Sequence, residues 1–179
     1  MNARLRRLYS DYQSVLDEFS GHPYITVTPL QGNPPETYQV EYRIRGLDLD
    51  PTTNRPRQRN YHKALIYLHR EYPREKPKCV LETPIFHPNF GAYICIGDYW
   101  AAGETLVDII IKIGQMIAYQ DYNVKSPLNA VAARWAEENK RVFPIDSRDL
   151  YQPEVDLDID LEESDAQPPA EDDLDIQLQ

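Results

Sequence analysis

Cysteine is scarce in this chain, which has only two, Cys79 and Cys95, among 179 residues. No segment of signal-peptide character precedes them, so we expect free thiols in a reducing, cytoplasmic compartment rather than a disulfide scaffold. Apolar runs fall short of the ~18 residues that a transmembrane helix needs, which predicts a soluble protein. With only four histidines beside the two cysteines, a closed zinc site is disfavoured, and we expect neither a metal nor an organic cofactor.

Basic residues are absent after Arg148, whereas residues 149–179 hold twelve of the 29 acidic side chains. The first 148 residues carry 19 basic and 17 acidic side chains, so the net charge of −10 belongs to the C-terminal stretch. That stretch alternates acidic and aliphatic residues and has too little apolar surface to offset its ordering entropy. We predict a folded domain over residues 1–148 and an acidic, disordered tail over 149–179. A nearly neutral domain with such a tail disfavours nucleic-acid binding.

Hydrophobic periodicity predicts one helix, then a group of strands, then two more helices. The helices are expected at 3–19, 103–120 and 128–143, and the strands at 24–30, 37–47, 60–69 and 78–83. A Gly, Asn and Pro turn joins the first two strands into a hairpin, and the polar stretch 48–59 is expected to be a loop. This order predicts an α+β fold with a four-stranded antiparallel meander sheet.

Apolar spacing also predicts which helix faces are buried. In the stretch 103–120 an isoleucine-rich stripe is flanked by Val107 and Ile111, which we expect to form a second buried face. The last helix is expected to turn three residues inward: Leu128, Val131 and Trp135. The exposed side of the first helix begins with three arginines, Arg4, Arg6 and Arg7, for which a solvated face and a docking surface both stay open.

A proline-punctuated loop over residues 84–100, PIFHPNFGAYICIGDYW, gathers the reactive groups. Cys95 stands in it between two isoleucines. A nucleophilic cysteine needs access and a donor for developing oxyanion charge, and an inert packed thiol is the alternative. His87, eight residues earlier, is a candidate base for a Cys–His pair. Cys79 lies in a strand-like segment and is predicted to be core.

The stretch 72–100, YPREKPKCVLETPIFHPNFGAYICIGDYW, resembles the core of ubiquitin-conjugating enzymes. Those enzymes have a tyrosine-proline with a proline-rich loop, a strand, a His-Pro-Asn tripeptide, a cysteine between aliphatic residues and a tryptophan soon after. The SPLN segment at 126–129 is similar to the proline-leucine that opens the helix after their active-site gate. The resemblance covers residues 1 to about 143 and implies that family's fold, with a long active-site loop and two further helices.

The resemblance implies a thioester carrier. Cys95 would accept the C-terminal carbonyl of a ubiquitin-like modifier from an activating enzyme, which consumes the ATP, and pass it to an amine of a target protein, usually a lysine. Asn89 would hold the oxyanion or shape the loop, while His87 and Pro88 would be structural. The arginine-rich first helix would face the activating enzyme. Because a thioester is already activated, aminolysis mainly needs orientation and stabilisation of developing charge.

Several positions depart from the family pattern. Only five residues separate Asn89 from Cys95, two fewer than in the familiar eukaryotic enzymes. Ser126 stands where many members place a gate aspartate, and Asp98 and Asp121 are the possible substitutes. The usual aromatic anchor for RING-type ligases and the loop that accompanies it are replaced, by Arg74 and by WAAG at 100–103. We therefore do not expect standard RING-ligase docking.

Lysine is the minority cation, with six among the 19 basic residues. Together with the short loops, this suggests a bacterial relative, from operons that pair a ubiquitin-like modifier with activating, conjugating and deconjugating enzymes and resemble antiviral defence systems. Two other functions stay open: a non-catalytic, modifier-binding module of the same fold, and a cysteine hydrolase that uses His87.

Overall fold

The computed structural model describes residues 2–97 and 100–151, which form the predicted α+β fold. The first helix has the predicted bounds, and the side chain of Asn2 caps it by accepting a hydrogen bond from the Leu5 amide at 2.8 Å. The elements in chain order are α1 (Ala3–Phe19), β1 (Ile25–Gly32), β2 (Pro35–Tyr42), β3 (Gly46–Leu49), β4 (Pro56–Arg59), β5 (His62–Tyr67), β6 (Lys78–Leu81), α2 (Leu106–Ile117), α3 (Ala130–Glu138) and a 3-10 turn (Lys140–Val142).

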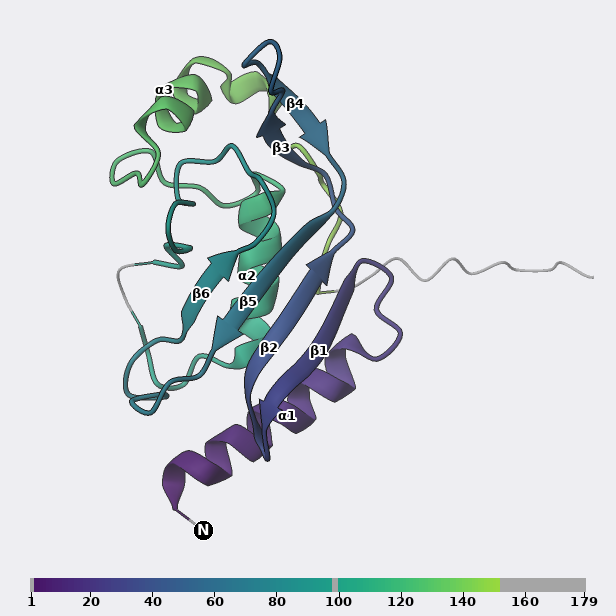
Figure 1. Cartoon of the computed structure of the whole chain (residues 1–179), viewed down its shortest axis with the longest axis vertical. Coiled ribbons are helices and arrows are strands. Elements are labelled where there is room, and N and C mark those ends of the chain that lie inside the picture. The colour runs from purple at the N-terminus through teal and green to yellow at the C-terminus, as the bar shows by residue number, and fades with distance from the viewer. Residues whose placement is uncertain (1, 98–99, 152–179) are drawn as a thin grey trace, which may run out of the picture.

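Four strands form one antiparallel sheet in the order β1-β2-β5-β6, the predicted meander. Figure 1 shows α2 running behind this sheet and α1 lying beside β1. Alternate residues of β2 and β5 turn inward, so Tyr38, Val40 and Ile66 join α2 in the main core. The Tyr42 hydroxyl donates a 2.9 Å hydrogen bond to the carbonyl of Ile110 in α2. The sheet and this helix together support the long loop between β6 and α2.

A capping box starts α2, which is shorter than the predicted stretch 103–120. The Thr105 hydroxyl accepts from the Asp108 amide at 3.1 Å, and the Asp108 carboxylate accepts from the Thr105 amide at 3.0 Å. Ile111 is fully buried, which confirms the second buried face there, whereas Val107 is only partly buried. The helix therefore packs on more than one side.

The prediction of a loop over residues 48–59 was wrong, because β3 and β4 pair there as a two-stranded ribbon. The carboxylate of Asp48 is 1% exposed and lies 2.8 Å from the Arg57 guanidinium and 3.2 Å from that of Arg59. Opposite charges facing one another across the strands stabilise the ribbon. Such a pattern is polar in sequence, so it lacks the apolar alternation that marks a strand.

The predicted inward face of the last helix was wrong for Leu128 and Val131 and held in part for Trp135, which packs against the smaller core cluster. The helix α3 is shorter than predicted and turns three alanines inward: Ala132, Ala133 and Ala136. Val131 is 70% exposed and Leu128 37% exposed. Trp135 is half-buried and packs edge-on against Phe86, with ring centroids 5.7 Å apart. Small side chains let α3 approach its neighbours closely. A prediction that assigns the largest apolar residues to the buried face does not detect such a helix.

The chain stays in the folded core up to Leu150, which is 1% exposed and packs against Gly114 of α2. A Cβ added at Gly114 would come within 2.6 Å of a Leu150 methyl carbon, so any larger residue there would have to displace the Leu150 side chain. The predicted tail starts at Asp149, so its first three residues are described and include the buried Leu150, while its residues 152–179 lie outside the described residues. Among the described residues, no helix is long and apolar enough to cross a membrane.

Candidate active site

His87 anchors the start of the reactive loop from a fully buried position. Its Nδ1 accepts a hydrogen bond from the Asn89 amide at 3.1 Å, and its ring lies 4.4 Å from that of Tyr119 and 4.9 Å from that of Phe90. Burial is the main cause that lowers the pKa of His87 to about 3. The Nε2 atom is buried without a hydrogen bond to the described residues. A neutral imidazole held in this way fits a structural role.

The side chain of Asn89 binds the segment after α2 through both the nitrogen and the oxygen of its amide. Its Nδ2 donates to the carbonyl of Asn123 at 2.8 Å, and its Oδ1 accepts from the Asn123 amide at 2.8 Å. The Asn89 carbonyl in turn accepts from the Cys95 amide at 2.9 Å. Asn89, which is 4% exposed, therefore joins Cys95 to the segment around Asn123.

Pro88 is buried and holds the start of α3. Its carbonyl accepts hydrogen bonds from the amides of Leu128 at 2.8 Å and Asn129 at 3.0 Å. Leu128 also covers Gly91, where an added Cβ would lie 3.2 Å from the Leu128 Cβ. The His-Pro-Asn tripeptide thus fixes the loop on both of its sides.

Cys95 is half-buried and opens into a pocket of about 320 Å³. The same pocket is lined by Asn89, Ser126 and Asp121, so the structure brings together these sequence-predicted residues. Lys112, Met116, Tyr122 and Asn123 also line it and were not predicted. Asn123 contributes through its backbone, which no side-chain pattern signals. Asp98 lies outside the described residues.

Cys79 contrasts with Cys95. It is 2% exposed on β6, and burial raises the pKa of its thiol to about 12. Its carbonyl accepts from the Ile94 amide at 2.8 Å, which ties the reactive loop to β6. The prediction that Cys79 is core is confirmed, and only Cys95 combines access with polar neighbours.

The three arginines of α1 have different surroundings. Arg4 donates to Glu36 at 3.0 Å and to the Leu68 carbonyl at 3.0 Å. Arg7 pairs with the buried Asp11 at 2.8 Å and also donates to carbonyls in the loop before α2, those of Ala102 and Glu104. Arg6 is exposed. Arg4 and Arg7 therefore help to hold α1 on the domain, and Arg6 is the most accessible of the three.

Comparison with known proteins places these features in a family. The family model for ubiquitin-conjugating enzymes matches residues 36–150. Ubiquitin-conjugating enzyme E2 S from Homo sapiens is 30% identical over 139 residues, covering 72% of this chain and 62% of the relative. The E2 S-A enzyme of Xenopus laevis is 29% identical over 139 residues. The chain thus spans about 62% of the length of its human relative.

A solved structure titled Novel Ubiquitin-Conjugating Enzyme has the same fold, with a TM-score of 0.54 at 21% identity. The likeness covers 76% of this chain and 87% of that one. The matched family region runs from β2 to Leu150 and includes the whole Cys95 pocket. The chain belongs to the ubiquitin-conjugating enzyme family.

Proposed function

We propose that Cys95 carries a ubiquitin-like modifier as a thioester and transfers it to an amine, most commonly a lysine, of a target protein. One observation carries this proposal: the accessible thiol shares a polar pocket with Asn89, whose side chain holds the gate segment. General thioester transfer is the activity of this family. The modifier, the activating enzyme and the acceptor are partners of that reaction.

The reaction needs two acyl transfers. The Cys95 thiolate attacks the thioester carbonyl on the activating enzyme, whose own thiolate leaves. The acceptor amine then attacks the Cys95 thioester carbonyl, loses a proton and expels the Cys95 thiolate. Neither step requires a metal or an organic cofactor, and both depend on orientation and on stabilising the tetrahedral oxyanion.

Asn89 supports both of its predicted roles. One Nδ2 hydrogen donates to Asn123, which shapes the gate segment, and the second hydrogen remains as a donor for an oxyanion beside Cys95. Asp121 and Ser126 line the same pocket and are our candidates for orienting the acceptor amine. The carboxylate of Asp121 is the better proton acceptor of the two. Asp98, outside the described residues, stays a sequence-based prediction.

The alternatives are less well supported. A hydrolase using His87 needs a basic imidazole, whereas burial keeps the pKa of His87 near 3 and its Nδ1 is already bonded to Asn89. A non-catalytic module has no use for an accessible cysteine in a polar pocket. Arg74 is exposed and pairs with Glu71, so an apolar ligase anchor is missing at that position. Docking of the activating enzyme on α1, through Arg6 above all, and a bacterial conjugation operon both remain predictions.

The proposal is tested by intact-mass spectrometry of the full chain with ATP, an activating enzyme and its modifier. We expect an adduct of one modifier mass that dithiothreitol removes, on wild type and on Cys79→Ala, and no adduct on Cys95→Ala. Cys79→Ala is the matched control for loss of a thiol. If wild type gains no adduct while the activating enzyme is itself charged, the carrier proposal is wrong and the binding-module function replaces it.

A further inference from the structure

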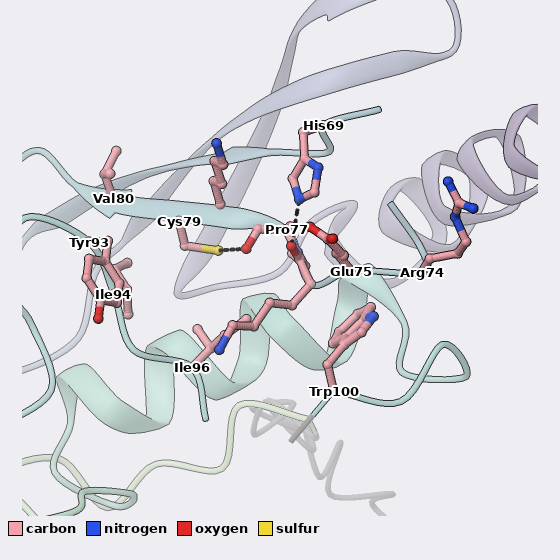
Figure 2. Close-up of a pocket in the computed structure, with 12 residues that line it drawn as sticks. His69, Arg74, Glu75, Pro77, Cys79, Val80, Tyr93, Ile94, Ile96 and Trp100 are labelled. Atoms are coloured by element: carbon pink, nitrogen blue, oxygen red, sulfur yellow. Dashed lines mark hydrogen bonds between the residues drawn. The ribbon is translucent and has the colours of Figure 1, made fainter. Parts of the chain in front are cut away.

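A second and larger pocket, of about 680 Å³, lies beside β6, separate from the Cys95 pocket except for one shared residue, Ile96. In Figure 2, Cys79 and Val80 lie on the strand, with Tyr93, Ile94 and Ile96 on the loop across from it. Trp100 lines the pocket from farther along the chain. Tyr93 is 52% exposed and Val80 37% exposed. The pocket therefore exposes apolar side chains, and no other part of the described chain covers them.

The edge of this pocket is basic. Lys76 and Lys78 both line it, and Lys78 is exposed. The Lys76 ammonium donates a hydrogen bond to the Gly97 carbonyl at 2.6 Å, so its charge stays at this edge of the pocket. Glu75 is the acidic residue among the lining side chains, while Arg74 is paired with Glu71. An occupant that combines aliphatic and acidic side chains is complementary to such a site.

The described chain ends at Tyr151, in a third pocket that has Ile96 in common with this one. Tyr151 lies in a small neighbouring pocket that is also lined by Ile96, and its hydroxyl donates to Asp108 at 3.5 Å. Three carboxylates line that neighbouring pocket, against one cation, Lys112: Glu104, Asp108 and Asp121. Its net negative charge disfavours an acidic segment. Two pockets therefore meet at Ile96. The one that contains Tyr151 is acidic, and the one beside β6 is apolar with a basic edge.

The sequence after Tyr151 has the complementary pattern. Four aliphatic residues alternate with three aspartates over residues 155–161, VDLDIDL. In an extended chain this alternation puts the aliphatic side chains on one side and the carboxylates on the other. Val155 is the fourth residue beyond Tyr151, and four extended residues reach about 13 Å.

We propose that residues 155–161 dock in the pocket beside β6 of the same molecule. The aliphatic side chains contact Tyr93, Ile94 and Trp100, and the aspartates approach Lys76 and Lys78. A short tether gives an effective concentration in the millimolar range. At that effective concentration, a segment with a dissociation constant of about 0.1 mM occupies the pocket most of the time and leaves it free about a tenth of the time. The proposal does not depend on Cys95 chemistry, so it stands or falls apart from the proposed function.

Hydrogen–deuterium exchange of the full chain, with no other protein present, tests the docking. We compare wild type with Leu157→Ser/Ile159→Ser, and follow peptides covering 78–81 and 93–96. Because docking covers these segments, we expect exchange there to be about tenfold faster in the variant. Leu174→Ser/Ile176→Ser removes the same kind of side chains farther along and is the matched control, expected to exchange like wild type. Equal exchange in wild type and Leu157→Ser/Ile159→Ser overturns the proposal.

A charge exchange tests the basic edge. Lys78→Glu is expected to speed exchange in peptide 93–96, and adding Asp158→Lys to restore it, since the reversed pair again attracts. Lys125→Glu, a charge change on another exposed lysine outside this pocket, should have no effect. Failure of the double variant to restore protection contradicts the charge pairing. Protection that increases with protein concentration would assign the occupant to a second copy and overturn docking within one molecule.

Discussion

At the scale of single residues, Asn89 is the side chain on which the site most depends. Asn89→Ala removes both hydrogen bonds to the Asn123 backbone and, in the proposed reaction, the donor to the oxyanion. We expect transfer from preformed Cys95 thioester to free lysine to slow by about 10²–10³, as when an oxyanion donor is removed. Thioester formation should persist, since the cysteine is untouched.

The same variant distinguishes the two roles of Asn89. If it shapes the gate, amide exchange across residues 121–126 should increase in Asn89→Ala relative to wild type. Ser126→Ala, in the same pocket but without those hydrogen bonds to Asn123, is the control and should leave that exchange unchanged. A slow enzyme whose gate segment exchanges normally would show that the amide acts on the oxyanion alone.

At the scale of secondary structure, the β3–β4 ribbon depends on one covered carboxylate. Asp48→Asn keeps the shape but loses the charge that Arg57 and Arg59 share. Because both arginines are partly exposed, we expect a loss of about 1 to 2 kcal/mol in the free energy of unfolding, measured with urea. Glu82→Gln, which breaks a 3.6 Å surface pair with Lys63, should change it by less than about 0.5 kcal/mol. Equal effects of the two changes would mean that the Asp48 charge contributes no more than an exposed surface pair.

Sequence predicted the elements whose signals are local. Helix α1 has regular apolar spacing and an Asn2 cap, and the His-Pro-Asn and cysteine motif pointed to the loop that brings Asn89 and Cys95 into one pocket. The β3–β4 ribbon is stabilised by pairing between charges, and α3 packs through small alanines, so neither follows the apolar patterns used to predict them. In the site, Asn123 was not predicted because its contacts with Asn89 are made by backbone atoms.

At the scale of the whole molecule, two buried imidazoles make stability depend on pH. Burial lowers the pKa of His62 to about 4 and that of His87 to about 3, from an ordinary 6.5. Below pH 6.5 the unfolded chain binds protons that the folded chain does not, so stability is lost as pH falls towards those values. Each imidazole contributes up to about 1.4 kcal/mol per pH unit.

Urea unfolding of the full chain between pH 6.5 and 4.5 measures this dependence. His62 lies outside the site. His62→Gln should remove up to one proton from the proton uptake on unfolding, and so reduce the slope of unfolding free energy against pH by up to about 1.4 kcal/mol per pH unit. This holds whatever the change does to overall stability. A slope identical to that of wild type would mean that His62 is not kept neutral by burial.

The difference in burial between the thiols of Cys79 and Cys95 also determines how the protein responds to oxidation. Cys79 is buried and its raised pKa keeps it protonated, so peroxide should oxidise Cys95 alone. A sulfenic acid at Cys95 then has no second accessible thiol in the chain with which to form a disulfide. Recovery depends on a thiol from outside, such as glutathione, and in its absence oxidation proceeds to the irreversible acids. Oxidative loss of Cys95 is therefore repaired by the redox state of the surroundings and not by the protein itself.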